Sequence, residues 1–222
     1  MRLSPRIAAA ALCVAVASCA TAGTAGDRMF DHFTRASSVQ SALIVGDLEG
    51  ARRPAAWLAE HDAVATAAPG DRGWLEALST ASAEIRDASS VDEAADATGR
   101  LAQSCAGCHT SSNRGPRFRS AGEPPRGDDR ATHMIRNLWA MDRMWEGLIG
   151  ASSETWAAGA RAIADEEPES FPGGSAVAAL ARAIHEQATR AERTPSGDRA
   201  EVYADLIKTC AGCHTLVGAG AD

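Results

Sequence analysis

The chain of 222 residues has the balance of a globular protein, with 45% hydrophobic and 23% charged residues. At about 150 residues per domain, this length allows one or two domains. The net charge of −7 argues against a nucleic-acid binder, because such proteins neutralise phosphates with clustered cations. Aromatic residues make up only 5%, which disfavours a large β-sandwich, whereas the many Ala, Leu, Glu and Arg residues favour helix.

Residues 1–18 have the layout of an export signal. Arg2 and Arg6 precede an apolar run that is shorter than the roughly 20 residues needed to span a bilayer. The following Val-Ala-Ser-Cys resembles the lipobox of bacterial lipoproteins, in which cleavage precedes Cys19 and its sulfur is lipidated. Ala20 is compatible with sorting to the outer membrane. The alternative is ordinary cleavage after Ala22, which would release a free protein, so either pathway predicts a periplasmic location. A lipid anchor is then the only expected contact with the membrane.

Helical periodicity broken by turn clusters predicts eight helices and no strand. We expect these helices at residues 28–46, 49–64, 72–88, 92–108, 130–149, 152–165, 174–192 and 198–213. Residues 113–128, rich in Gly, Pro and Arg, have the composition of a linker.

The two groups of four helices repeat each other. A shift of 101 residues places His32 on His133, and a shift of 105 places Cys-Ala-Gly-Cys-His at 105–109 on the same pentapeptide at 210–214. We therefore predict an all-α protein of two tandem four-helix bundles, at residues 27–112 and 129–218, joined by the linker. Each bundle carries the pentapeptide at the end of its fourth helix.

Cys-x-x-Cys-His is the attachment signature of c-type haem. Two thiols three residues apart in helix-like backbone reach both vinyl groups on one haem edge, and the adjacent His lies under the iron. We expect two covalent haem groups, held by Cys105 and Cys108 and by Cys210 and Cys213. The proximal iron ligands are then His109 and His214. Haem is attached outside the cytoplasm, so the export signal supports the same prediction.

Three alternatives to haem fit the two Cys pairs less well. A thioredoxin-like redox pair opens a helix after a strand, and no strand is predicted. A single zinc ion held by four thiols usually has its pairs about 15 to 20 residues apart, rather than a whole four-helix unit apart. A disulfide within each motif would leave the repeated histidines unexplained.

The placement of the motif at the end of a fourth helix resembles the class II cytochromes c, the cytochrome c-prime family of four-helix bundles. The resemblance covers both halves and rests on the motif, its position and the helix pattern. It implies a haem inside each bundle, attached to the fourth helix and covered on its distal face by the first. In that family, high-spin members place an apolar residue over the iron and bind small gases, whereas low-spin members place a Met there and transfer electrons.

The sequence departs from both patterns at the distal position. The residue repeated on the first helix of each half is a histidine, His32 and His133, which would give bis-histidine iron. Met134 is a rival in the second half, but Phe33 occupies the matching position in the first, so a shared Met ligand is excluded. The alternative is a structural histidine at the start of a helix.

Two further groups have open interpretations. His61 and His185 have no counterpart in the other half, and we expect them at the surface or beside haem propionates. The basic stretch after the first motif is either a solvated linker, or a set of partners for haem propionates or for an acidic protein. Its arginines are Arg114, Arg117, Arg119, Arg126 and Arg130.

These observations predict a dihaem cytochrome that carries single electrons between periplasmic or membrane redox proteins. Bis-histidine or His/Met ligation closes the iron to substrates, and the sequence offers no pocket with paired acid and base groups. We therefore expect no enzyme, and a peroxidase is disfavoured because no distal acid-base set is identifiable. The alternative is a gas-binding or gas-sensing protein with an open distal site.

Overall fold

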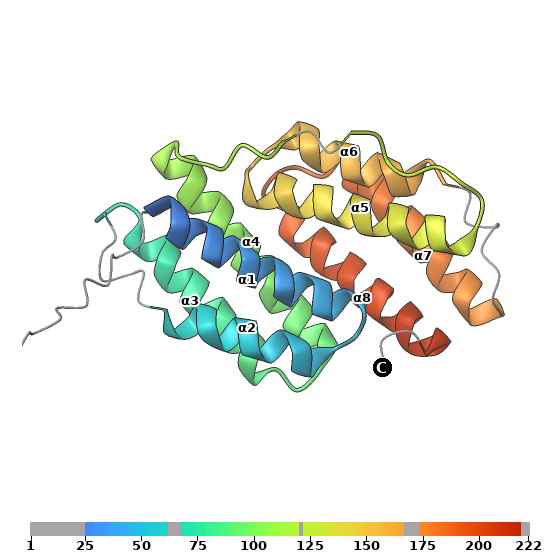
Figure 1. The fold of residues 1–222 in the computed structure, drawn as a ribbon, viewed down its shortest axis with the longest axis horizontal. Helices are drawn as coiled ribbons and strands as arrows, with labels where there is room; N and C mark the ends of the chain where they lie inside the picture. Colours follow the sequence, from blue (N-terminus) through green and yellow to red (C-terminus); the bar gives the residue numbers. More distant parts are fainter. Residues whose placement is uncertain (1–24, 62–67, 120–121, 167–173, 219–222) are drawn as a thin grey trace, which may run out of the picture.

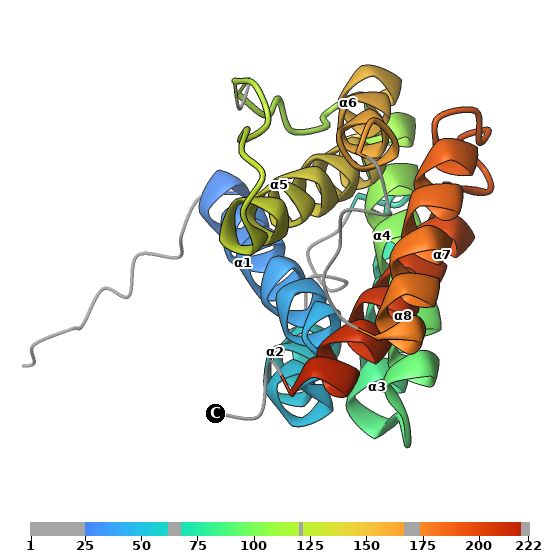
Figure 2. The same cartoon turned by 90° about the vertical axis from the view of Figure 1, so that its right-hand side faces the viewer.

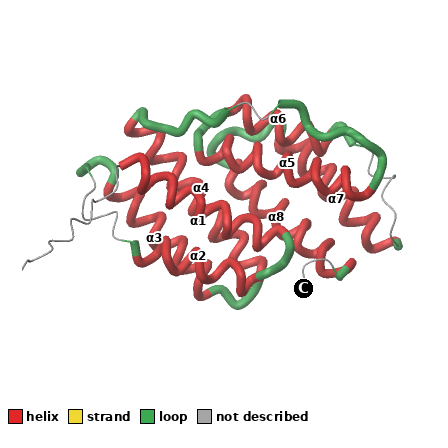
Figure 3. Tube along the Cα trace, in the orientation of Figure 1, coloured by secondary structure: helices red, strands yellow, loops and turns green. Residues whose placement is uncertain are grey.

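The computed structural model describes residues 25–61, 68–119, 122–166 and 174–218, so the predicted export signal and Cys19 lie outside the described residues (Figure 1). The described part of the chain forms eight helices and contains no strand (Figure 3). These are α1 (Ala25–Ile44), α2 (Leu48–Glu60), α3 (Arg72–Asp87), α4 (Val91–Ser112), α5 (Arg130–Ile149), α6 (Ser153–Ala164), α7 (Ser175–Ala191) and α8 (Arg199–Val217). The prediction of an all-α protein is confirmed.

Side-chain caps fix the starts of four helices. Asp47, Ser90, Asp129 and Ser152 each accept a hydrogen bond from a backbone N–H in the first turn of α2, α4, α5 and α6. Such a cap satisfies one of the donors that a helix start leaves unpaired. The caps explain why these four helices begin within about one residue of the predicted positions.

The ends of α4 and α8 lie later than predicted. Both helices continue through the Cys-x-x-Cys-His motif and stop where Asn113 and Gly218 adopt left-handed backbone conformations. Each motif therefore lies inside a regular helix. Residues three apart on a helix share a face, so the two thiols of a motif point to the same side.

Consecutive helices pack against each other within each half. The order is α1 with α2, α2 with α3 and α3 with α4, and helices α5 to α8 repeat it. The first and last helices of each half also touch. Between the halves, α4 packs along α8, and reciprocal contacts join α1 to α8 and α4 to α5 (Figure 2). The eight helices thus form one packed body.

The α4–α8 pair runs antiparallel at close range. A Cβ on Gly99 would lie 2.6 Å from the carbonyl oxygen of Ala200, near the start of α8. The Nζ atom of Lys208, further along α8, lies 2.6 Å from Oδ1 of Asp96, earlier on α4. The two Cys-x-x-Cys-His motifs consequently face opposite ends of this helix pair.

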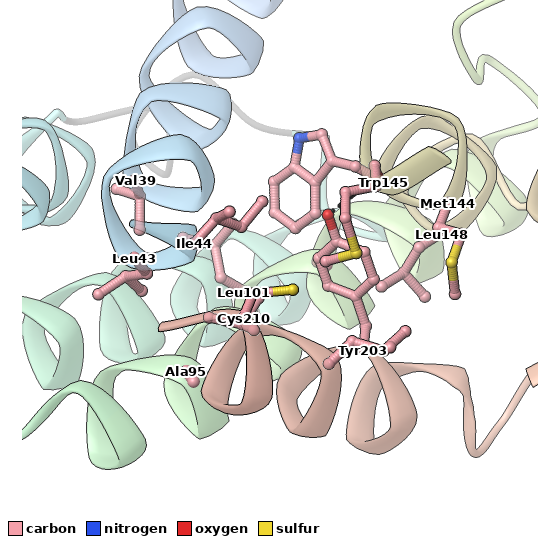
Figure 4. Packing of buried hydrophobic residues seen from close by; sticks show 14 of the residues in the cluster. Val39, Leu43, Ile44, Ala95, Leu101, Met144, Trp145, Leu148, Tyr203 and Cys210 are labelled. Atoms are coloured by element: carbon pink, nitrogen blue, oxygen red, sulfur yellow. Dashed lines mark hydrogen bonds between the residues drawn. The ribbon is translucent and has the colours of Figure 1, made fainter. Parts of the chain in front are cut away.

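One hydrophobic cluster extends across both halves, from Leu43 and Leu101 to Trp145 and Tyr203 (Figure 4). The Tyr203 hydroxyl crosses the boundary between the halves, because it accepts a hydrogen bond from Nε2 of Gln40 and donates one to the carbonyl oxygen of Met141, each at 3.0 Å. Within the described ranges, no helix is both long and apolar enough to cross a membrane.

Candidate functional site

An apolar cavity lies between the four helices of the first half. Its volume is about 50 Å³, below the roughly 300–1,000 Å³ that is typical of ligand pockets, so the surrounding side chains would have to move apart to admit a haem. Its lining includes His32 on α1 and Cys105, Cys108 and His109 on α4. The structure therefore brings to one space four side chains whose roles were predicted from two distant parts of the sequence.

The remaining walls of this cavity are mostly apolar. They come from every helix of the first half and from the end of α5, and they include Leu58, Leu78, Leu101 and Ile149. The ring of Trp74 on α3 covers the backbone of the motif, where a Cβ on Gly107 would lie 2.4 Å from the ring. Such walls suit an apolar group better than water.

The thiols on the wall of the cavity are free and neutral. None of the four motif cysteines forms a disulfide. Burial, with a smaller effect of the neighbouring Cys108, raises the pKa of Cys105 to about 12. Burial also raises the pKa of Cys108, and the carboxylate of Asp71 adds to that rise. Both thiols are therefore available for covalent attachment, and the disulfide that was considered as an alternative within each motif is absent from the structure.

A backbone carbonyl from the second half orients His109. Its Nδ1 lies 2.9 Å from the carbonyl oxygen of Ile149, at the end of α5. A carbonyl can only accept, so Nδ1 donates and the neutral ring keeps its lone pair on Nε2. Histidines that bind metals characteristically donate from the other ring nitrogen to a carbonyl or carboxylate. His109 is thus held in the tautomer that an iron ligand needs.

His32 is a buried imidazole with an unsatisfied nitrogen. The residue is 8% exposed, and its Nδ1 is buried without a hydrogen-bond partner. Burial, followed by the charge of His61, lowers the pKa of His32, so the ring is neutral at pH 7. Leaving such a polar atom unpaired costs about 1–3 kcal/mol. A ligand in the cavity that accepted the ring's free lone pair would offset part of this cost.

The residues of the first half fit a haem c. Two free thiols lie on one face of α4, and two imidazoles from α1 and α4 line the same apolar space. Across the described ranges, no group of three or more His, Cys, Asp or Glu side chains gathers to hold a metal ion. The single zinc site of four thiols is therefore not formed.

The motif of the second half is packed more tightly. Cys210 and Cys213 are 7% and 8% exposed, and Cys210 belongs to the hydrophobic cluster (Figure 4). Burial raises the pKa of Cys210 to about 12 and lowers that of His214, whose Nδ1 is buried and unpartnered. Thr215 and the carbonyl of Ala211 lie against Gly46, just after α1. This motif, like the first, therefore contacts the other half of the chain.

His133 differs from its counterpart His32. Its Nδ1 lies 2.7 Å from Oε2 of Glu166, and its Nε2 lies 3.1 Å from Nδ2 of Asn137. The amide nitrogen donates to Nε2, whereas Nδ1 and the carboxylate are in close contact without a hydrogen bond. These partners lie on α5 and just after α6. The structure thus brings His32 to its motif, whereas the described contacts of His133 do not reach the motif on α8.

Sequence reasoning missed the groups that orient these histidines. The Ile149 partner is a backbone carbonyl, which leaves no signal in a sequence, and Glu166 is 33 residues from His133. His61 is exposed, as expected, and stacks on Trp57 with ring centroids 3.5 Å apart. His185 is half-buried instead.

Comparisons with protein-family models, with curated proteins and with solved structures found no match to this chain.

Proposed function

We propose that the protein is a dihaem c-type cytochrome that carries single electrons between redox proteins of the periplasm, and that Cys19 anchors it to the membrane through lipid. One observation carries this proposal. The apolar cavity of the first half gathers the two thiols of the motif with His109 and His32. Two thiols alone would suit other chemistry, but two thiols and two imidazoles around an apolar space suit haem.

Each side chain of the first site has a distinct part in this proposal. Cys105 and Cys108 hold the haem edge through thioether bonds. His109, oriented by the Ile149 carbonyl, binds the iron from α4, and His32 binds it from α1. When bound, haem supplies a one-electron couple between ferric and ferrous iron. Two protein ligands leave the iron without an open position, which favours electron transfer over reaction with a substrate.

The second half is proposed to repeat this unit as a second haem-binding four-helix bundle. Cys210, Cys213 and His214 take the corresponding parts. The distal ligand is the exception, because both ring nitrogens of His133 already have partners in Glu166 and Asn137. That observation favours the alternative function for this half alone, an open distal site that binds a small gas.

The test is the ferric spectrum of the exported protein, together with its haem count. Two haem groups are expected, of which the first is low-spin. His32→Ala should change the ligation of one haem, which turns high-spin unless the thioether of Met29, the other donor side chain of α1 in the cavity, takes the place of His32. His185→Ala, a histidine on α7 outside the cavity, is the matched control and should leave the spectrum unchanged.

The outcomes separate the possible functions. A chain without haem overturns the cytochrome proposal, and an unchanged spectrum in His32→Ala removes that residue as a ligand. For the second haem, loss of a low-spin signal in His133→Ala would assign ligation to His133. Carbon monoxide uptake by one haem of the unmodified protein would instead assign an open site to the second half.

A further inference from the structure

A second cavity adjoins the first at the end of α4. Its volume is about 590 Å³, it is open to solvent, and residues after α4 form one of its walls. That wall includes Arg114, Arg117 and Arg119. The two cavities share four lining residues, Met29, Phe33, His109 and Ile149. The two cavities are therefore neighbours that meet at these four residues, an inner one and an outer one.

The inner and the outer cavity are lined by different chemical groups. Cys105 and Cys108 line the inner cavity and not the outer one, whereas the three arginines line the outer cavity and not the inner one. His109 lines both. A haem c has the same order of groups, since its thioether bonds are on one edge, the iron is in the middle and two carboxylates are on the opposite edge.

We propose that Arg114, Arg117 and Arg119 bind the propionate carboxylates of the haem that is attached at Cys105 and Cys108. This inference rests on the proposed haem function. Arginine suits the task because its planar guanidinium binds a carboxylate through two parallel hydrogen bonds.

The charges of the outer cavity support the assignment. Among the ion pairs of the described residues, none involves Arg114, Arg117 or Arg119, whereas Arg126 of the same basic stretch is paired with Glu123. The charge of Arg114 is close enough to Cys108 to oppose the rise in the pKa of that thiol. Three cations that have no carboxylate partner among the described residues thus stand beside the motif in a chain whose net charge is −7.

Packing holds the arginine segment over this space. Phe118 packs against Phe33 of α1 with ring centroids 5.3 Å apart. On its other side, a Cβ on Gly150 would lie 3.1 Å from the Phe118 ring. The segment between Arg117 and Arg119 is therefore fixed to both halves rather than left as a solvated linker. An acidic protein partner could also bind arginines, but their position beside the inner cavity that the motif thiols line favours the haem.

The test is the reduction potential of the first haem. A Cys210→Ser, Cys213→Ser background restricts covalent attachment to the first site. In it, the triple variant Arg114→Gln, Arg117→Gln, Arg119→Gln is compared with the double variant Arg126→Gln, Arg130→Gln. Positive charges favour the added electron, so the triple variant should be harder to reduce. We expect a shift of about tenfold in the ratio of oxidised to reduced haem, which is 59 mV for one electron. The double variant should leave the reduction potential unchanged.

Replacing the three arginines with lysine should restore most of the reduction potential, because lysine keeps the positive charge. The frequencies of the propionate carboxylate vibrations in the resonance Raman spectrum should stay altered, because lysine lacks the bidentate geometry of arginine. If the triple variant loads less haem, the three single Gln variants should each give part of the shift. An unchanged potential in all of them, with weaker binding of polyglutamate, would assign the arginines to protein docking and overturn the proposal. A parent protein without haem would instead overturn the proposed function itself.

Discussion

The structure predicts that the first cysteine of each motif is a weaker nucleophile than the second. Burial raises the pKa of Cys105 and of Cys210 to about 12, with a further effect from the second thiol of each pair. Cys108 and Cys213 also have raised pKa values, from burial and, for Cys108, from Asp71. Only the thiolate is a nucleophile, so these environments control the rate at which each thiol reacts.

Alkylation of the haem-free protein should distinguish the two positions. At pH 8, a thiol with a pKa of about 12 is ionised only to about one part in 10⁴. Iodoacetamide should therefore modify Cys105 at least about ten times more slowly than Cys108, as measured by peptide mass spectrometry over time. In urea all four thiols should react alike. Equal rates for Cys105 and Cys108 in the folded protein would contradict the burial of the first thiol.

The individual site residues differ in how far the sequence could predict them. The motif residues are contiguous, and a fixed spacing on a helix is enough to define them. His32 was predicted from repetition alone, and the structure places it in the same cavity as the motif. The same repetition predicted an equivalent role for His133, but its partners Glu166 and Asn137 are side chains without a counterpart that the repeat could indicate.

At the scale of helices, hydrophobic periodicity predicted the existence of all eight elements, because each buries one face. Periodicity did not predict where α4 and α8 end. Their last turns carry Ser112 and an exposed Leu216 rather than a continuing apolar stripe, and the ends depend on the left-handed caps Asn113 and Gly218. Nothing in the residue pattern indicates that α4 lies along α8, since small residues at a contact are not distinct from small residues elsewhere.

Gly99→Ala tests the close approach of α4 and α8. The new Cβ would lie 2.6 Å from the carbonyl oxygen of Ala200, so the helices must separate. We expect the free energy of unfolding to fall by about 1–3 kcal/mol, as for other overpacked cores, although alanine alone favours a helix by about 1 kcal/mol over glycine. The measurement is urea denaturation followed by circular dichroism.

Gly73→Ala on α3 is the matched control for this substitution. No atom lies within 4 Å of its added Cβ, so helix propensity alone should act and stability should not fall. If Gly99→Ala proved as stable as Gly73→Ala, the two helices would not be in the contact that the structure gives them.

At the scale of the whole molecule, the two halves complete each other. The motif on α4 is oriented by the carbonyl of Ile149 in the second half, and the motif on α8 packs against Gly46 in the first. The internal repeat predicted two similar units, but a repeat carries no information about how the units pack together. The shared core implies that the two Cys-x-x-Cys-His motifs respond to the same global stability, although they lie toward opposite ends of the α4–α8 pair.

Tyr203→Phe tests whether this boundary unfolds as one unit. The substitution removes the acceptor of the fully buried Gln40 amide, 3.0 Å away on α1, while keeping the aromatic contact with Trp145. An unsatisfied buried donor costs about 1–3 kcal/mol, and each kcal/mol lowers Tm by about 2–4 °C in a chain of this size. The double variant Gln40→Leu, Tyr203→Phe removes both partners and should recover part of the loss.

Because the bond joins α1 to α8, we expect a single unfolding transition, whose midpoint shifts equally when it is followed by circular dichroism and by haem absorbance at either site. Two separate transitions, of which only one moved, would show that the halves unfold independently despite their common core.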